Sequence, residues 1–425
     1  MSSPKTTPSD RDHPLRASLS HQMHARKLPP LKPPATLRQI VMLVDEAEAA
    51  ASVAHVRSLL HKGAKLDDEA RFHSCRLGEI GFAWERHNEF VTCTFIAEAT
   101  GDALFDATPF ERFGAWLAAA PGQVVRASLI SLLDRMRPWP SEEELARIFA
   151  MDDLVISDVA DGRARIWTDF RLHGDSGRML IADRGLSGNE THQLVQRLQE
   201  LGNYRKMALL GLPVAQRLLP QVTASERSMA ALARELTDGG SSDDALLARL
   251  SELSADVARM IAETRYRMSA TQAYGELALD RMRRLVVAQV PGFPSLPDFT
   301  ERRLLPAMRT CDAFSRRLDD MSQRLSWISD LLRTRVDTEL ARQNRDLLAS
   351  MDRRTRLQLR LQQAVEGLSV VAISYYLVGL VGHAARLLHY AGLDVDRELV
   401  TALSVPIALL AAGLGLRALH KRLHD

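Results

Sequence analysis

The stretch GLSVVAISYYLVGLVG (Gly367–Gly382) carries no charged side chain, and neither does LVTALSVPIALLAAGLGL (Leu399–Leu416). An α-helix rises about 1.5 Å per residue, so runs of this length approach the roughly 30 Å hydrocarbon thickness of a bilayer. Backbone groups in lipid must bond within their own segment, which favours a helix for both runs. We therefore expect a hairpin of transmembrane helices at residues 367–385 and 399–416. A pair of buried core helices is the alternative.

Basic residues flank this hairpin on both outer sides. Before the first run, and in the basic tail 417–425 after the second, they are Arg353, Arg354, Arg356, Arg360, Arg417, Lys421 and Arg422. The short connection around Gly392 instead contains three acidic residues beside Arg386 and Arg397. The positive-inside rule places both outer flanks in the cytoplasm. Because the N-terminal stretch MSSPKTTPSDRDHP lacks the apolar core of an export signal, we expect the N-terminus and the body to be cytoplasmic too.

Composition excludes several classes of protein. Of 425 residues, 46% are hydrophobic and 25% are charged, which is ordinary for a globular chain and argues against a wholly disordered one. The net charge of +2 gives no general affinity for nucleic acid, and the basic helix faces lack interleaved aromatic residues. Three cysteines without CxxC spacing form neither a zinc motif nor a disulfide framework. The partners we expect are membrane lipid and further copies of the chain, with no nucleic acid and an unknown ligand.

The N-terminal part alternates between strand and helix patterns. Residues 1–35 form a disordered tail with a short helix, and residues 36–186 form an α/β domain. TLRQIVMLV (Thr36–Val44) is typical of a strand, followed by a helix from Asp45 to Gly63. Further segments are antiparallel strands within 71–98, a helix at 110–119, a strand at 123–133, a helix at 142–150, and two strands joined by a turn at Asp161 and Gly162.

From Ser187 onward the pattern shows helices and no strand. We expect a stalk of long helices over residues 187–366, including helices up to Gly211, from about Ala224 to Thr237, and from the GGSSDD linker to about Ala288. A heptad seam then follows, which is typical of a coiled coil: Leu318, Met321, Leu325, Ile328 and Leu332. The whole chain is thus predicted to be α+β, with a cytoplasmic α/β domain, a helical-bundle or coiled-coil stalk, and a two-helix transmembrane hairpin.

Polar residues that could carry chemistry cluster in the N-terminal third. They are His24, Arg26, His87, Glu89, Asp169, Arg171 and His173. His87 and Glu89 could ligate a metal from one strand face, yet at a hairpin turn such a pair is more often solvated. We regard His87, Glu89 and His173 as weak metal candidates and predict no catalytic residue. Phosphate-binding glycine loops, nucleophile elbows and zinc-protease motifs do not occur in the sequence, so no cofactor is expected.

One resemblance covers most of the chain. QLRLQQAVEGLSVVAISYYLVGLVGH (Gln358–His383) and QRLQELGNYRKMALLGLP (Gln196–Pro213) resemble the signature of a bacterial family of membrane-anchored proteins that carry domain of unknown function 3422. The chain departs from that pattern at Gln22–Leu28, where an acidic residue and a proline are expected. The resemblance implies a multi-pass protein of the bacterial cytoplasmic (inner) membrane, and it implies no activity.

The architecture is also similar to CorA-type cation channels, although the Gly-Met-Asn filter of those channels is missing. The corresponding stretch runs from Val378 to His383, and we interpret Gly379 and Gly382 within it as helix-packing positions. The leading hypothesis is therefore an oligomeric, non-enzymatic protein for binding, sensing or scaffolding. A CorA-like channel or transporter and a membrane-tethered enzyme using His87, Glu89 and His173 are the alternatives.

Overall fold

The computed structural model describes residues 13, 15–16, 20, 29–60, 66–99, 103–238, 242–390 and 396–424. They divide into two compact units, Met1–Trp327 and Ile328–Asp425. Most of the predicted tail and short helix, the predicted helix end at Gly63, and most of the glycine-serine linker lie outside the described residues.

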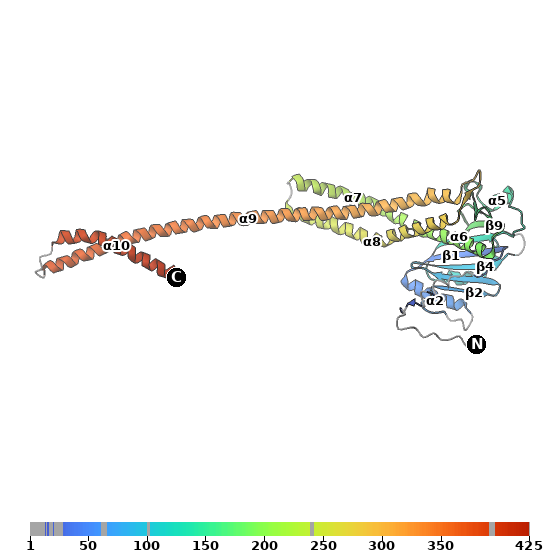
Figure 1. Cartoon of the computed structure of the whole chain (residues 1–425), viewed down its shortest axis with the longest axis horizontal. Coiled ribbons are helices and arrows are strands. Elements are labelled where there is room, and N and C mark those ends of the chain that lie inside the picture. The colour runs from blue at the N-terminus through green and yellow to red at the C-terminus, as the bar shows by residue number, and fades with distance from the viewer. Residues whose placement is uncertain are drawn as a thin grey trace. The chain divides into compact units, whose positions relative to one another are not determined.

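The first unit is built on one mixed sheet, at the right of Figure 1. Its strands are β1 (Ala35–Leu43), β2 (Phe72–Leu77), β3 (Ile80–Arg86), β4 (Phe90–Glu98), β5 (Gln123–Leu132), β6 (Val155–Val159), β7 (Ala164–Thr168), β8 (Leu172–His173), β9 (Ser176–Asp183) and β10 (Ala288–Gln289). They follow the order β10-β6-β7-β9-β5-β1-β4-β3-β2, with β8 added beside β9. Only the pair β5 and β9 is parallel among the described strands.

Helices cover both faces of this sheet. The first face packs against α2 (Glu46–Leu59), α3 (Thr108–Glu111), α4 (Gly114–Ala118), α5 (Glu142–Ile148) and a 3-10 turn (Met151–Asp153). The second face packs against α6 (Gly188–Leu209), α8 (Asp243–Arg283) and the start of α9 (Leu296–Tyr390). Because strand side chains alternate between faces, β1 contributes Ile40 to the first core and Leu37 and Val41 to the second. The remaining helices are α7 (Gly211–Asp238) and α10 (Arg397–His424).

Local sequence signals account for several elements. Asp45 caps α2 with a reciprocal capping box: its side chain accepts from the Glu48 backbone N–H at 2.8 Å, and the Glu48 carboxylate accepts from the Asp45 N–H at 2.9 Å. The predicted turn at Asp161 and Gly162 is confirmed, with φ values of 58° and 78°. The expected helix at 110–119 is instead the pair α3 and α4.

Two predictions about the helical region were wrong. Helix α7 begins at Gly211 rather than near Ala224, because Pro213 occupies the first turn, where no backbone N–H is needed, and the helix continues through Pro220. The chain also returns to the sheet after α8. Strand β10 pairs with β6, and the Leu296 N–H donates to the Ser157 hydroxyl at 2.8 Å, so α9 starts at the edge of the sheet.

The predicted heptad seam is buried against the chain's own helices in the first unit. Leu318, Met321 and Leu325 are at most 3% exposed. Upstream, a Cβ on Gly275 of α8 would lie 2.2 Å from the Met308 side chain of α9, so these two helices approach closely there. Arg317 of α9 also forms an ion pair at 2.7 Å with Glu226 of α7. The seam therefore serves an intrachain helix bundle in this unit.

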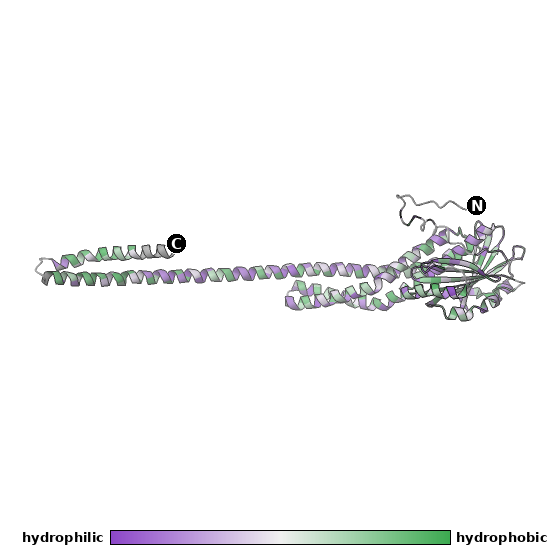
Figure 2. Cartoon of the chain, turned by 90° about the horizontal axis from the view of Figure 1, so that it is seen from below, coloured by the Kyte–Doolittle hydropathy of each residue, from purple (hydrophilic) through white to green (hydrophobic). Residues whose placement is uncertain are grey.

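The second unit contains the rest of α9 and α10. Figure 2 shows mainly hydrophobic colour along the last part of α9 and along the middle of α10, whereas the preceding part of α9 mixes polar and apolar residues. The two helices contact one another where the Ser374 hydroxyl lies 3.4 Å from the Ala408 carbonyl oxygen. Small residues line this contact: past Leu332, the buried residues among those described in this unit are Ser374, Ala385, Ala408 and Ala412.

Candidate functional site

His87 and Glu89 lie in the turn between β3 and β4, where the sequence places a turn. The His87 backbone N–H donates to the Phe90 carbonyl at 2.8 Å and closes the turn. The Val44 N–H donates to the Glu89 carbonyl at 2.9 Å, which ties the turn to the end of β1. The two side chains are used differently: the His87 ring stacks on Phe90 with centroids 4.0 Å apart, while Glu89 contacts α8.

Glu89 forms an ion pair with Arg267 of α8, and only 9% and 15% of these two side chains are exposed. Burial, followed by the negative charge of Glu89, raises the pKa of Tyr266 and of Tyr274 on the same helix. Removing one partner of a buried pair costs about 3–5 kcal/mol, because the other charge stays behind unpaired. The ion pair of Glu89 thus links the turn between β3 and β4 to α8.

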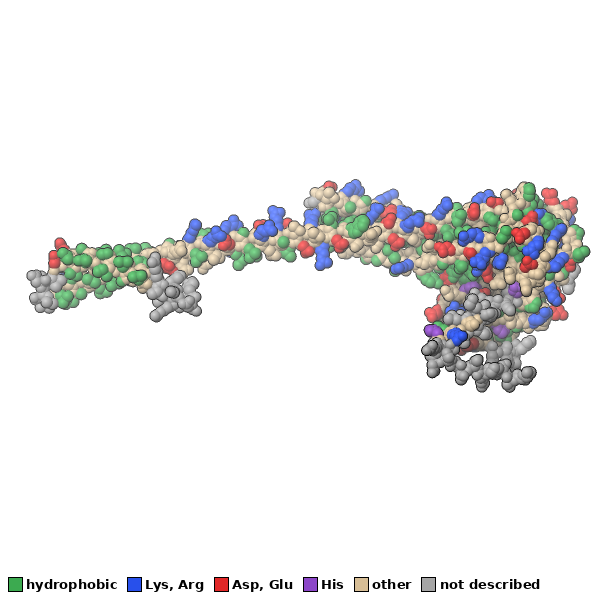
Figure 3. All heavy atoms as spheres, in the orientation of Figure 1, with side chains coloured by type: hydrophobic (Ala, Val, Ile, Leu, Met, Phe, Trp, Pro, Cys, Tyr) green, Lys and Arg blue, Asp and Glu red, His purple; other side chains and the backbone are tan. Residues whose placement is uncertain are grey.

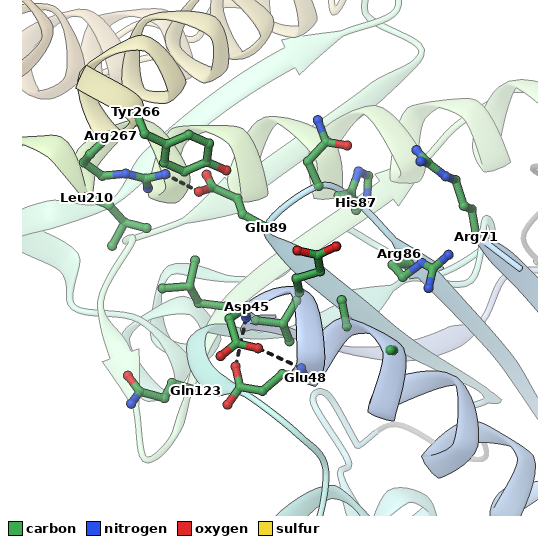
Figure 4. Close-up of a pocket in the computed structure, with 16 residues that line it drawn as sticks. Asp45, Glu48, Arg71, Arg86, His87, Glu89, Gln123, Leu210, Tyr266 and Arg267 are labelled. Carbon is green, nitrogen blue, oxygen red and sulfur yellow. Dashed lines mark hydrogen bonds and ion pairs between the residues drawn. The ribbon is translucent and has the colours of Figure 1, made fainter. Parts of the chain in front are cut away.

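This ion pair forms one wall of an open cleft of about 1200 Å³, here named the Glu89 cleft. Figure 4 shows Glu89, Tyr266 and Arg267 on one side of the cleft, with Arg71 and Arg86 on the other.

The Glu89 cleft has no excess of one charge to select a ligand. Its floor includes Asp45 and Glu48, whose carboxylates are already engaged in the α2 cap. His87 also lines the cleft, and its Nε2 lies 3.6 Å from the Glu85 carboxylate. The described residues contain no group of three His, Cys, Asp or Glu side chains that could hold a metal ion.

His173 lies elsewhere in the domain. Its Nε2 is 2.7 Å from a carboxylate oxygen of the buried Asp169, which also accepts from the Ala150 N–H at 2.9 Å. Arg171 pairs with Asp153 rather than with Asp169. His173 does not line the Glu89 cleft, so the three residues named for a membrane-tethered enzyme do not share one cavity. His24 and Arg26 lie outside the described residues.

The structure also contains a cluster of basic side chains that was not predicted from the sequence. Arg126 of β5 and Arg205 and Lys206 of α6 line one pocket on the second face of the sheet. One signal was present in the sequence: Arg126 and Ser128 share a strand face with Ile130 and therefore point polar groups toward a buried layer. Their convergence with residues about eighty positions later requires the tertiary fold.

Two helical segments are long and apolar enough to cross a membrane. One falls within Leu296–Leu388 and the other is Glu398–Gly415, each with a window of mean hydropathy 1.8. Only 6% and 17% of these windows are buried within the chain, which separates them from the core helices of the first unit. Figure 3 shows the same apolar surface near the C-terminus, with basic side chains gathered on the preceding stretch of α9.

The residues predicted to flank and pack these segments can be placed in part. Arg353, Arg354, Arg356 and Arg360 are exposed on α9, whereas the side chains of Arg417, Lys421 and Arg422 are not among those the structure describes. Among the glycines, a Cβ on Gly382 would lie 3.9 Å from the Thr401 hydroxyl of α10, and a Cβ on Gly379 would meet no described atom within 4 Å. Gly382 thus faces the second helix and Gly379 faces outward.

The chain is an α+β protein. Its mixed ten-stranded sheet is covered by helices, and two apolar helical segments follow, the first of them within the long helix α9. A family model described as "Protein of unknown function (DUF3422)" matches residues 11–423. The chain belongs to this family. Comparison with curated proteins and comparison with solved structures both give no match.

Proposed function

We propose that this protein is a membrane-anchored binding protein: the first unit is a cytoplasmic head that binds a ligand without catalysing a reaction, and the end of α9 with α10 is its anchor. The observation that carries the proposal is the exposed apolar surface of these two segments. Among the side chains that the structure describes, seven Leu, Ile or Val residues from Leu368 to Leu388 and seven from Leu399 to Leu414 are at least 39% exposed. Leaving such side chains in water costs on the order of 10 kcal/mol in total, which lipid would relieve.

The basic flanks support one orientation. Arg353, Arg354, Arg356 and Arg360 precede the first segment, and the connection between the segments carries three acidic residues. We propose a multi-pass hairpin in the inner membrane, with its connection outside and both termini inside. Cations near the inner surface add about 1 kcal/mol each through anionic headgroups.

This anchoring is tested by extraction and labelling of the full chain in its native membrane. The chain should stay in the pellet after carbonate washing. Gly392→Cys should react with an impermeant maleimide in intact cells, and Arg422→Cys should react only after lysis. Release by carbonate, or the reverse labelling pattern, would contradict the proposal.

We further propose that the head is held in an oligomer by α9. Between the first heptad seam and the apolar end of α9, this helix presents a second apolar seam, here named the distal seam: Leu340, Leu347, Met351, Leu361 and Val365. Each of these side chains is more than half exposed. With Asn344, Arg354 and Gln358 they complete an uninterrupted heptad pattern.

A second copy of the chain fits the distal seam best. Two copies anchored in one membrane run parallel, so identical positions face one another, and a buried Asn344 in the seam would fix their register. In a Cys75→Ser background, Leu347→Cys should crosslink between copies, whereas Ala349→Cys, two residues away on the outer face, should not. Equal crosslinking at both positions, or a monomer with both, would refute a specific pairing.

A further inference from the structure

The pocket on the second face of the sheet is the strongest candidate for the ligand site of the head. It has a volume of about 230 Å³ and lies between β5, β9 and α6. We name it the Arg126 pocket after the side chain at its centre; Ser128, Phe170, Arg205 and Lys206 also line it. It is separate from the Glu89 cleft and shares no lining residue with it.

Arg126 is held in a fixed position. Its Nη1 donates to the side-chain oxygens of Gln39 at 2.8 Å and of Asn203 at 2.9 Å, and both of these residues are buried. Its guanidinium packs against Gly202, where an added Cβ would lie 2.7 Å from Nη2. Both hydrogen-bond acceptors are neutral amides, so they orient the guanidinium but leave its charge uncompensated.

Arg205 is positioned by aromatic rings. Its guanidinium lies 4.1 Å from the ring centroid of Phe170 and 5.7 Å from that of Phe299. The two rings stack on one another at 4.0 Å. A guanidinium held by its face keeps its N–H donors directed outward in the plane, where they can reach an anion.

The positive charges in this pocket act on one another. Burial, with the charge of Arg205, lowers the pKa of Arg126 to about 9, and burial lowers that of Arg205 to about 10. Burial and both arginine charges lower the pKa of Lys206. With pKa values of about 9 and about 10, both arginines remain cationic near pH 7. Among the described residues, no carboxylate pairs with any of them, and the acid at the rim, Asp175, pairs with Arg38 at 2.7 Å.

Ser128 supplies a second, independent observation. It follows Arg126 by two positions on β5 and therefore faces the same side of the sheet. The residue is only 5% exposed, it lines the pocket, and its hydroxyl has no hydrogen-bond partner among the described residues. A buried hydroxyl without a partner costs free energy, which a bound acceptor or donor would recover.

We propose that the Arg126 pocket binds a phosphate monoester group. Three cations without an acidic partner match the charge of about −1.5 to −2 that such a group carries at pH 7, and its oxygens can accept from both guanidiniums at once. The group could belong to a soluble phosphorylated metabolite or to the headgroup of phosphatidic acid, because both present the same terminal phosphate. This assignment gives the proposed binding function a ligand class, and it does not depend on the membrane anchor.

Calorimetry on the full chain in neutral detergent tests the site. Glycerol 3-phosphate and inorganic phosphate should bind saturably, and Arg126→Gln should weaken binding at least tenfold. The exposed Lys206→Gln, which leaves the core intact, should weaken it several-fold. Arg197→Gln, a change on the same helix outside the pocket, should leave affinity within twofold of wild type.

A third titration distinguishes the two sources of phosphate. Dioctanoyl phosphatidic acid that binds at least tenfold more tightly than glycerol 3-phosphate assigns the group to a lipid, whereas equal affinities assign it to a soluble molecule. Dioctanoyl phosphatidylcholine, which has no terminal phosphate, should not bind. The proposal is overturned if no phosphate compound binds saturably, or if Arg126→Gln and Lys206→Gln both bind as wild type does. Either result would leave membrane anchoring untouched.

Discussion

Gly202→Ala is the sharpest test of the packing around Arg126. In the middle of a helix this change ordinarily stabilises by about 1 kcal/mol, because alanine loses less backbone freedom than glycine. Here the new methyl group would lie 2.7 to 2.8 Å from three atoms of the Arg126 guanidinium. A guanidinium ends a flexible side chain and can move aside, but moving it breaks the bonds to Gln39 and Asn203.

Those two bonds involve a charged donor and are worth about 1.5–3 kcal/mol each. Subtracting the helix gain leaves a net destabilisation of about 2–5 kcal/mol. With about 2.1 cal/mol/K of unfolding entropy per residue, the first unit should lose about 3–7 °C in Tm. Tryptophan fluorescence during heating of the full chain in detergent measures this, since Trp84 and Trp167 are buried in the first unit.

Gly188→Ala is the matched control in the same helix. An added Cβ there meets no described atom within 4 Å, so its Tm should change by less than about 1 °C. If Gly202→Ala is as stable as Gly188→Ala, the Arg126 guanidinium does not pack against Gly202, and the Arg126 pocket does not have the geometry described above.

Three further predictions concern other parts of the chain. Burial favours the neutral form of Asp183, but hydrogen bonds from Thr191, two backbone N–H groups and Arg135 outweigh it and hold its pKa below the ordinary value. Its stabilising contribution is therefore full above the unfolded pKa near 4 and is lost as pH falls below that value, so wild type should lose more Tm between pH 6 and pH 3 than Asp183→Asn. Arg267→Met should cost about 3–5 kcal/mol by leaving Glu89 buried and unpaired, and adding Glu89→Gln should recover part of this loss in a thermal melt; equal single and double variants would contradict the ion pair. Liposomes containing the full chain should show no cation flux above empty liposomes, and any saturable flux would favour the channel alternative.

Local signals made much of the fold predictable. Strand β1 follows from a short continuous apolar run, and the cap of α2 follows from Asp45 three residues before Glu48. Both features lie within one short window of sequence. The apolar C-terminal segments could also be predicted, because their length and composition alone distinguish them from the other helices of the chain.

The elements missed by sequence interpretation depend on distant partners. Strand β10 has two residues, and its partner β6 lies about 130 positions earlier, so no periodicity identifies it. The first heptad seam indicated a helix partner correctly, but the partner is the chain itself, because a seam does not specify which helix covers it. At the site, His87, Glu89 and His173 were only weak candidates, and no spacing in the sequence required them to lie together. The cations that do lie together come from β5 and α6.

The pairing of β10 with β6 has a consequence for synthesis of the chain. The ribosome synthesises α6, α7 and α8 before β10, so the edge of β6 that pairs with β10 has no partner strand while about 130 further residues are translated. During that interval the nascent polypeptide displays an unprotected edge, which is a common start of aggregation. A polypeptide that stops at Arg283 would keep that edge permanently, and we expect such a fragment to accumulate in inclusion bodies even though it contains nine of the ten strands.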